Sequence, residues 1–293
     1  MLPWLLAAGM LAVYAITLNH WVSPGNVHEI ARLSGLTWRV ELGRPFTYLI
    51  TFPLQWLPAV WVPVAANFLT ALCAAGVLGL LARSVALLPH NRTQAERQKN
   101  PAPPHVLTIS GAWLPPALAA LACGFQLTFW EHAVTATSEM PDLLLFAYLV
   151  RCLLEYRVSE KKSWLLRWAL VDGVAMSNNW IMAAFLPAFL AGWFLVLGGT
   201  SWFTPQSLAR LLKEKLRVFD LGLLGRLLGC WLAGASLVLL MPLIARLTPG
   251  AHPPFWASLG IELRYYYFML TAFPPGRAGL MWLTSVVPVI FIC

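Results

Sequence analysis

Long apolar stretches recur through almost the whole of this sequence. Six of them reach the length that a membrane-spanning helix needs, about 17–25 residues. They are Leu2–Val22, Trp61–Ala82, Val106–Phe129, Met140–Tyr156, Trp180–Leu197 and Leu227–Ile244. A shorter stretch, Leu165–Met176, and a last one from Leu280 to Cys293 raise the expected number to about seven or eight membrane segments. Because the last stretch is too short to cross, we expect the natural protein to continue beyond Cys293.

The composition agrees with this pattern and sets the fold class. The chain is 59% hydrophobic and 11% charged, and it contains 15 Trp, which is far from the average of soluble domains. We therefore predict an all-α polytopic transmembrane helical bundle that forms a single transmembrane domain over residues 1–293. The five cysteines are odd in number and scattered, so they predict neither a disulfide framework nor a metal-ligand spacing.

The basic residues predict an orientation. Of the 20 Lys and Arg residues, 14 fall in or beside three linkers, which we place at 83–105, 157–164 and 198–226. The positive-inside rule puts these linkers and the N-terminus in the cytoplasm. The first outer loop is then 23–58 and a second outer loop is 248–279. The net charge of +8 is explained by the linkers, and it gives no reason to expect a nucleic-acid partner.

A cluster of titratable side chains lies between two apolar stretches, at the predicted outer face. It comprises Glu131, His132, Glu139 and Asp142. Glu131, His132 and Glu139 could mark where the chain leaves the bilayer, and Glu139 just before a proline suits a helix N-terminus. Asp142 is more informative, because a carboxylate inside an apolar stretch costs several kcal/mol unless it is paired or hydrated.

Two further predicted outer segments contain polar candidates. Glu29 is either a solvated loop carboxylate or a general base. Arg44 is either a loop charge or a phosphate ligand, for which its guanidinium is well suited. Asn178 and Asn179 follow the short apolar stretch, where they could link two helices or donate hydrogen bonds to an anionic group. These segments predict one outward-facing site.

Three motifs resemble a bacterial membrane family related to protein O-mannosyltransferases, within the GT-C superfamily of glycosyltransferases. "FWEHAV" (129–134) is similar to the family's "FW-x-x-AV". "GVAMSNNWIMAAFLPAFL" (173–190) is similar to "GLALGNHxTMLLLLPAL". "GRPFTYLITFPLQWLP", followed by "VAANFLTALCAAGVLGLL" with Asn67, resembles "PGYPLYTLLGRL … VNLLSALFAAL".

This resemblance implies an activity, a donor and a location. Such enzymes transfer a sugar from a polyprenyl-phosphate carrier to an acceptor hydroxyl, with inversion, at the outer face of the membrane. It also implies residence in a bacterial inner membrane, with the active site periplasmic. A carboxylate of the first outer loop would take the proton of the hydroxyl, and cations or amides would meet the departing phosphate.

The chain departs from the family pattern at three places, and at one of them the family's His-Pro is missing, with "VELGRP" in its place. The family's first loop reads Asp-Ser-Gly-Glu, whereas this chain has "NVHE", so Asn26 stands at the Asp position and Glu29 is the remaining acid. The His of the family's "GNH" is Asn179 here. We therefore predict Glu29 as the catalytic base and place Glu139, Asp142 and Glu131 as secondary acidic groups.

For the lipid phosphate we predict four ligands: Arg44, His132, Asn178 and Asn179. The carboxylates could hold a divalent cation beside the phosphate, although no ligand spacing demands one. The expected partners are a polyprenyl-phosphate-linked sugar and membrane lipid, and the acceptor is open. The alternative function is a non-catalytic or transporter-like membrane protein that binds a lipid-linked sugar; for the transporter form we find no internal repeat.

Overall fold

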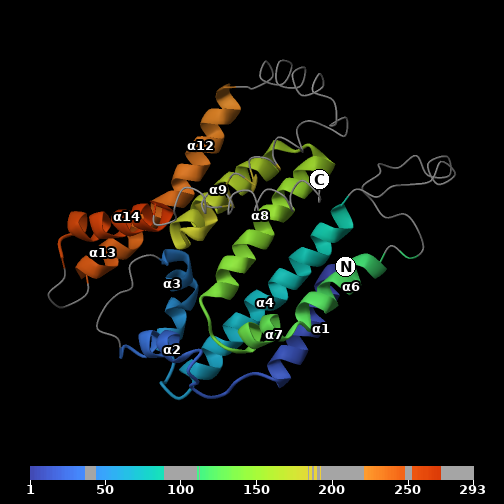
Figure 1. Cartoon of the computed structure of the whole chain (residues 1–293), viewed down its shortest axis with the longest axis horizontal. Helices are drawn as coiled ribbons and strands as arrows, with labels where there is room; N and C mark the ends of the chain where they lie inside the picture. Colours follow the sequence, from blue (N-terminus) through green and yellow to red (C-terminus); the bar gives the residue numbers. More distant parts are fainter. Residues whose placement is uncertain are drawn as a thin grey trace. The chain divides into compact units, whose positions relative to one another are not determined.

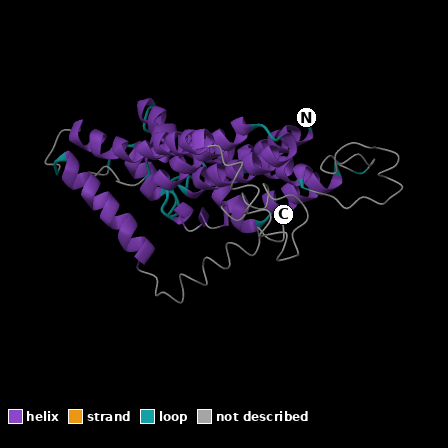
Figure 2. Cartoon of the chain, turned by 90° about the horizontal axis from the view of Figure 1, so that it is seen from above, coloured by secondary structure: helices purple, strands orange, loops and turns teal. Residues whose placement is uncertain are grey.

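The computed structural model describes residues 1–36, 44–88, 111, 113–183, 185–186, 188–189, 192, 221–247 and 253–271. Every regular element among them is helical, and Figure 2 shows helices and loops without a strand in this part of the chain. The predicted all-α class is therefore confirmed for the described residues. The chain divides into two compact units, Met1–Arg151 and Cys152–Cys293. The single transmembrane domain over residues 1–293 stays a prediction.

The first unit contains the helices that precede the division and most of α8. They are α1 (Leu2–Ile16), α2 (Val27–Leu33), α3 (Pro45–Thr51), the 3₁₀ helix η1 (Phe52–Trp56), α4 (Val62–Leu87), α6 (Leu114–Gly124), α7 (Leu127–Val134) and α8 (Glu139–Ser159). Helix α4 is the longest of these, and α1, α6 and α7 pack against it. Figure 1 shows α1, α4 and α6 running alongside one another.

The core of this unit is built where α1 and α6 meet α4. Tyr14 of α1 is completely buried, and its hydroxyl donates a hydrogen bond of 2.8 Å to the backbone oxygen of Gly124 at the end of α6. Gly124 has no room for a side chain, because a Cβ there would come within 2.8 Å of Leu78 and Met10. A glycine at this position lets α6 approach α1 and α4 closely.

The second unit contains α9 (Lys162–Asn178), α12 (Leu221–Ala235), the 3₁₀ helix η2 (Ser236–Leu239), α13 (Leu240–Leu247) and α14 (Phe255–Thr271). Helices α9 and α12 cross at two glycines, Gly173 and Gly234, where a Cβ on either would overlap the backbone of the other helix. Beside the crossing, the indole N–H of Trp231 donates to Oδ2 of Asp172 at 3.0 Å. Asp172 is thus a polar partner inside the bundle.

The number of helices that could cross a membrane is smaller than we predicted from the sequence. In the described residues two are long and apolar enough, Val62–Leu87 and Gly222–Arg246, and a third is obtained if the bent pair α7 and α8 forms one span. The prediction of seven or eight is therefore corrected for this part of the chain. Half of the predicted segment Trp180–Leu197, and the whole segment that begins at Leu280, lie outside the described residues.

Two of the predicted segments are shorter as helices. Helix α1 ends at Ile16, and the hydroxyl of Thr17 bonds back to the carbonyl of Val13 at 2.9 Å. Helix α6 ends at Gly124, and Gln126 has the extended backbone that begins α7. Polar side chains near helix ends compete with the helix for backbone groups, and hydropathy does not register that competition.

Candidate functional site

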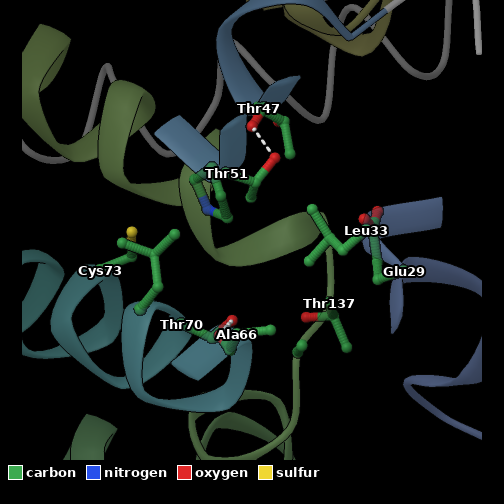
Figure 3. Close-up of a pocket in the computed structure, with 11 residues that line it drawn as sticks. Glu29, Leu33, Thr47, Thr51, Ala66, Thr70, Cys73 and Thr137 are labelled. Atoms are coloured by element: carbon green, nitrogen blue, oxygen red, sulfur yellow. Dashed lines mark hydrogen bonds between the residues drawn. The ribbon is translucent and has the colours of Figure 1, made fainter. Parts of the chain in front are cut away.

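One pocket of the first unit is formed by four segments of the chain (Figure 3). Helix α2 contributes Glu29 and Leu33, and α3 contributes Thr47 and Thr51. Helix α4 forms another wall with Ala66, Leu69, Thr70 and Cys73, and the segment that leads from α7 into α8 adds Ala136, Thr137 and Pro141. The pocket contains about 320 Å³ of empty space, part of which is open to solvent.

Glu29 supplies the carboxylate in the wall of this pocket. Its side chain is 13% exposed, and its Oε2 lies 2.6 Å from Nη2 of Arg32, whose side chain is 8% exposed. The same Nη2 lies 3.4 Å from the hydroxyl oxygen of Thr51 on α3. Arg32 therefore links α2 to α3 and holds the carboxylate of Glu29 at the pocket wall.

Several threonine side chains share the wall of the pocket with Glu29. Thr51 donates to the backbone carbonyl of Thr47 at 2.8 Å, and Thr70 donates to the carbonyl of Ala66 at 3.1 Å. The buried hydroxyl oxygen of Thr137 has no hydrogen-bond partner among the described residues, and Figure 3 shows it directed into the pocket. A buried hydroxyl without a partner is rare in proteins, which sets Thr137 apart from the other threonines of the pocket.

The break between α7 and α8 places the cluster that the sequence analysis singled out. The direction of the chain bends by 115° from one helix to the next. Glu139 at the start of α8 is exposed and lies 3.0 Å from Nδ1 of His132, an ion pair when the imidazole is protonated. Glu131 is also exposed, whereas Asp142 is buried at 7% exposure. The bend itself reaches the pocket through Thr137 and Pro141.

The remaining predicted phosphate ligands lie elsewhere in the chain. Arg44 is half-buried and immediately precedes α3, but it does not line the pocket. Asn178 is completely buried at the end of α9, in the second unit. The side-chain oxygen of Asn179 accepts the backbone N–H of Ile181 at 3.0 Å. The phosphate-binding role of these residues stays a prediction.

Among the residues that line the pocket, Glu29 is the one that the sequence analysis predicted for the site. Arg32 and Thr137 were missed. Arg32 follows Glu29 by three residues, a spacing that brings two side chains together on a helix, so a helix assigned to 27–33 could have revealed the pair. Thr137 had no signal of its own, because only the packing leaves its hydroxyl without a partner.

Metal binding has no structural signature in the part of the chain described here. No group of three or more His, Cys, Asp or Glu side chains within the described ranges is placed to hold a metal ion. His132 and Glu139 form a pair, and Glu29 is occupied by Arg32. The divalent cation therefore stays an untested prediction.

Comparison with known proteins identifies the family. A sequence model described as the protein O-mannosyl-transferase TMEM260 N-terminal domain matches residues 41–198, which is more than half of the chain. No curated protein and no solved structure was found to match. The matched segment includes the pocket walls formed by α3, α4 and the start of α8, whereas α2 with Glu29 precedes it. The chain therefore belongs to the family of the protein O-mannosyl-transferase TMEM260 N-terminal domain.

Proposed function

We propose that this protein is a membrane O-mannosyltransferase whose reaction takes place at the Glu29 pocket. The family's name supports the mannosyl transfer, and the apolar helices support a membrane location. The observation that carries the proposal is the nearly buried carboxylate of Glu29 in the wall of a partly open pocket. The other walls of this pocket lie mainly in the segment that the family model matches.

The proposed donor is a mannose linked to a polyprenyl phosphate. The acceptor hydroxyl oxygen attacks the anomeric carbon, and the bond from that carbon to the phosphate oxygen breaks. The bonding electrons leave with the polyprenyl phosphate, and the hydroxyl proton passes to the carboxylate of Glu29. The products are an inverted O-mannoside and the free lipid phosphate. A carboxylate in a site that is mostly shielded from water is the residue type that this proton transfer requires.

The remaining parts of the proposal come from the sequence. The fold is a GT-C-type bundle with its N-terminus in the cytoplasm, and the pocket faces the periplasmic side of a bacterial inner membrane. Arg44, His132, Asn178 and Asn179 act on the lipid phosphate, and Glu131, Glu139 and Asp142 are secondary acidic groups. These assignments are hypotheses that mutagenesis of each residue would test.

A second function is favoured by the ion pair itself. A carboxylate oxygen that lies 2.6 Å from an arginine nitrogen is already occupied by a structural partner, whereas a base must present its oxygen to the acceptor hydroxyl. A protein that binds a lipid-linked sugar without turnover would have no such conflict. The two functions differ in whether donor is consumed.

The deciding experiment follows radiolabelled mannose from polyprenyl-phosphate mannose in nanodiscs that contain the purified protein. We expect transfer or release of mannose, and a loss of about 100-fold or more in Glu29→Gln, the scale of general-base catalysis. Glu160→Gln is the matched control, because Glu160 is exposed beyond the end of α8. Equal turnover in the two variants would exclude Glu29 as the base. Donor binding without turnover in the wild-type protein would establish the binding function.

A further inference from the structure

The side chain of Asn67 joins three segments of the first unit. Asn67 lies in the second turn of α4 and is completely buried. Its amide oxygen accepts the backbone N–H of Ala136 at 2.6 Å and the side-chain N–H of Asn26 at 3.3 Å. Its amide nitrogen donates to the backbone carbonyl of Asn19, beyond the end of α1. One residue thus uses both halves of its amide.

These contacts lie directly behind the walls of the Glu29 pocket. Ala66, the neighbour of Asn67, and Ala136, its partner, both line the pocket. Asn26 precedes α2 and is three residues before Glu29. The carbonyl of Trp21 accepts the other bond of the Asn26 amide, and the oxygen of that amide accepts the N–H of Ser23 at 2.7 Å. Asn67 itself does not line the pocket.

The chemistry of the three bonds requires an amide of this length. Two donors converge on one oxygen, and an acceptor faces the nitrogen. Aspartate has the same shape but cannot donate to the carbonyl of Asn19. The N–H of Ala136 lies in the break between α7 and α8, where no helix bond is available, and it would be buried without a partner if the asparagine were absent.

We propose that Asn67 is a positioning residue that sets the wall bearing Glu29 against the wall bearing Thr137. Its bond to Asn26 positions the start of α2, and its bond to Ala136 positions the bend between α7 and α8. The inference depends on the proposed function for its effect on turnover, whereas its effect on the geometry of the pocket is independent of that function. Asn67 does not line the pocket, so its effect on a bound donor would be indirect.

Cys73 provides a readout of the pocket that needs no activity. It lines the pocket and is 7% exposed, so maleimide reaches its thiol when the walls separate. In Asn67→Asp we expect Cys73 to be labelled about fivefold faster or more. The buried carboxylate would face the carbonyl of Asn19 where the amide donated, and this repulsion would displace the side chain from Asn26 and Ala136 and favour local opening. Peptide mass spectrometry would follow Cys73 beside Cys230, a half-buried cysteine of α12 whose labelling should not change. Ser84→Ala is the matched control: Ser84 is buried near the other end of α4.

Asn26→Asp is a second variant in case Asn67→Asp does not fold. It keeps the oxygen that accepts the N–H of Ser23 and removes the donor to Asn67 and to the carbonyl of Trp21, and we expect the same direction of change. In the mannose-transfer assay, Asn67→Asp should lower kcat while the KM for the donor stays within about twofold, as expected when a transition-state interaction is lost.

The labelling result decides the proposal in either case. Wild-type labelling of Cys73 in both Asn67→Asp and Asn26→Asp would overturn it, as would equal acceleration in Ser84→Ala. If the wild-type protein shows no mannose transfer, the proposed function fails, yet accelerated labelling would still establish Asn67 as the residue that holds the pocket together. Accelerated labelling with an unchanged kcat would overturn the link between this geometry and turnover.

Discussion

Nη2 of Arg32 lies 2.6 Å from Oε2 of Glu29, with both side chains largely withdrawn from solvent at 8% and 13% exposure. The two residues are one turn apart on α2, and the same guanidinium nitrogen is 3.4 Å from the hydroxyl of Thr51 on α3. The pair therefore connects the candidate base to the neighbouring wall of its pocket. A charge pair in this setting depends strongly on both partners, because either charge by itself would be poorly hydrated.

Replacing Arg32 tests this dependence. Arg32→Met leaves the carboxylate of Glu29 without its partner, and we expect the free energy of unfolding to fall by about 3 kcal/mol. The double variant Glu29→Gln/Arg32→Met should lose less than the two single variants together, with a coupling on the order of 1 kcal/mol or more. Denaturant titration of the four proteins in detergent measures the cycle. Simple additivity would mean that the pair contributes no net stability.

The crossing of α9 and α12 predicts a contrast between two glycines of the same helix. A Cβ on Gly234 would overlap the carbonyl oxygen of Leu170, whereas a Cβ on Gly229 would meet nothing within 4 Å. Gly234→Ala should therefore cost about 1–3 kcal/mol, as overpacking does. Gly229→Ala should be neutral or stabilising by up to about 1 kcal/mol, because alanine favours the helix.

Unfolding of the two glycine variants, measured side by side, checks this contrast. The comparison controls for the change in helix propensity, which has the same sign in both variants. An equal effect of the two alanines would show that α9 and α12 do not make their close approach at Gly234.

Glu262 on α14, outside the candidate membrane spans, predicts a pH dependence. Its side chain is 2% exposed, its oxygens have no hydrogen-bond partner among the described residues, and burial raises the pKa of this carboxyl to about 7 from 4.5. Because the folded state holds the proton more tightly than the unfolded state, the stability is fully present below pH 4.5 and decreases as the pH rises toward 7. The decrease is on the order of 3 kcal/mol, because each pKa unit corresponds to about 1.4 kcal/mol.

Glu262→Gln removes the titrating group and keeps its shape. We expect this variant to lose the pH dependence between pH 4.5 and 7 and to be more stable than the wild-type protein at pH 8. Thermal unfolding of both proteins across this range gives the answer. A wild-type melting temperature that rises with pH over the same interval would contradict the assignment to Glu262.

The sequence was informative where local chemistry decides the structure. The apolar stretches predicted helices, and Val62–Leu87 and Gly222–Arg246 include two of the predicted membrane segments. The short apolar stretch Leu165–Met176 was predicted as a membrane segment, and it lies within the helix α9. Glu29 was predicted as the acid of the site, and it is the predicted residue that lines the pocket.

The sequence was less informative about helix ends and about partners distant in the chain. Hydropathy continues through Thr17 and Gln126, where the backbone leaves the helix. The cluster of Glu131, His132 and Glu139 appeared as one polar group, but the break between α7 and α8 exposes both glutamates while it brings Thr137 to the pocket. An apolar stretch gives no sign of a helix break whose free backbone N–H is bonded by a side chain from elsewhere in the chain.

By itself the sequence determined that this chain forms apolar helices, and it placed a carboxylate in the segment between α1 and α3. Both follow from composition and residue type. Only the tertiary structure decided that α2, α3, α4 and the bend after α7 meet around Glu29. The physical reason is that the N–H of Ala136, which makes no helix bond, and the side-chain N–H of Asn26 both donate to the amide oxygen of Asn67. Neither periodicity nor hydropathy encodes such a long-range pairing.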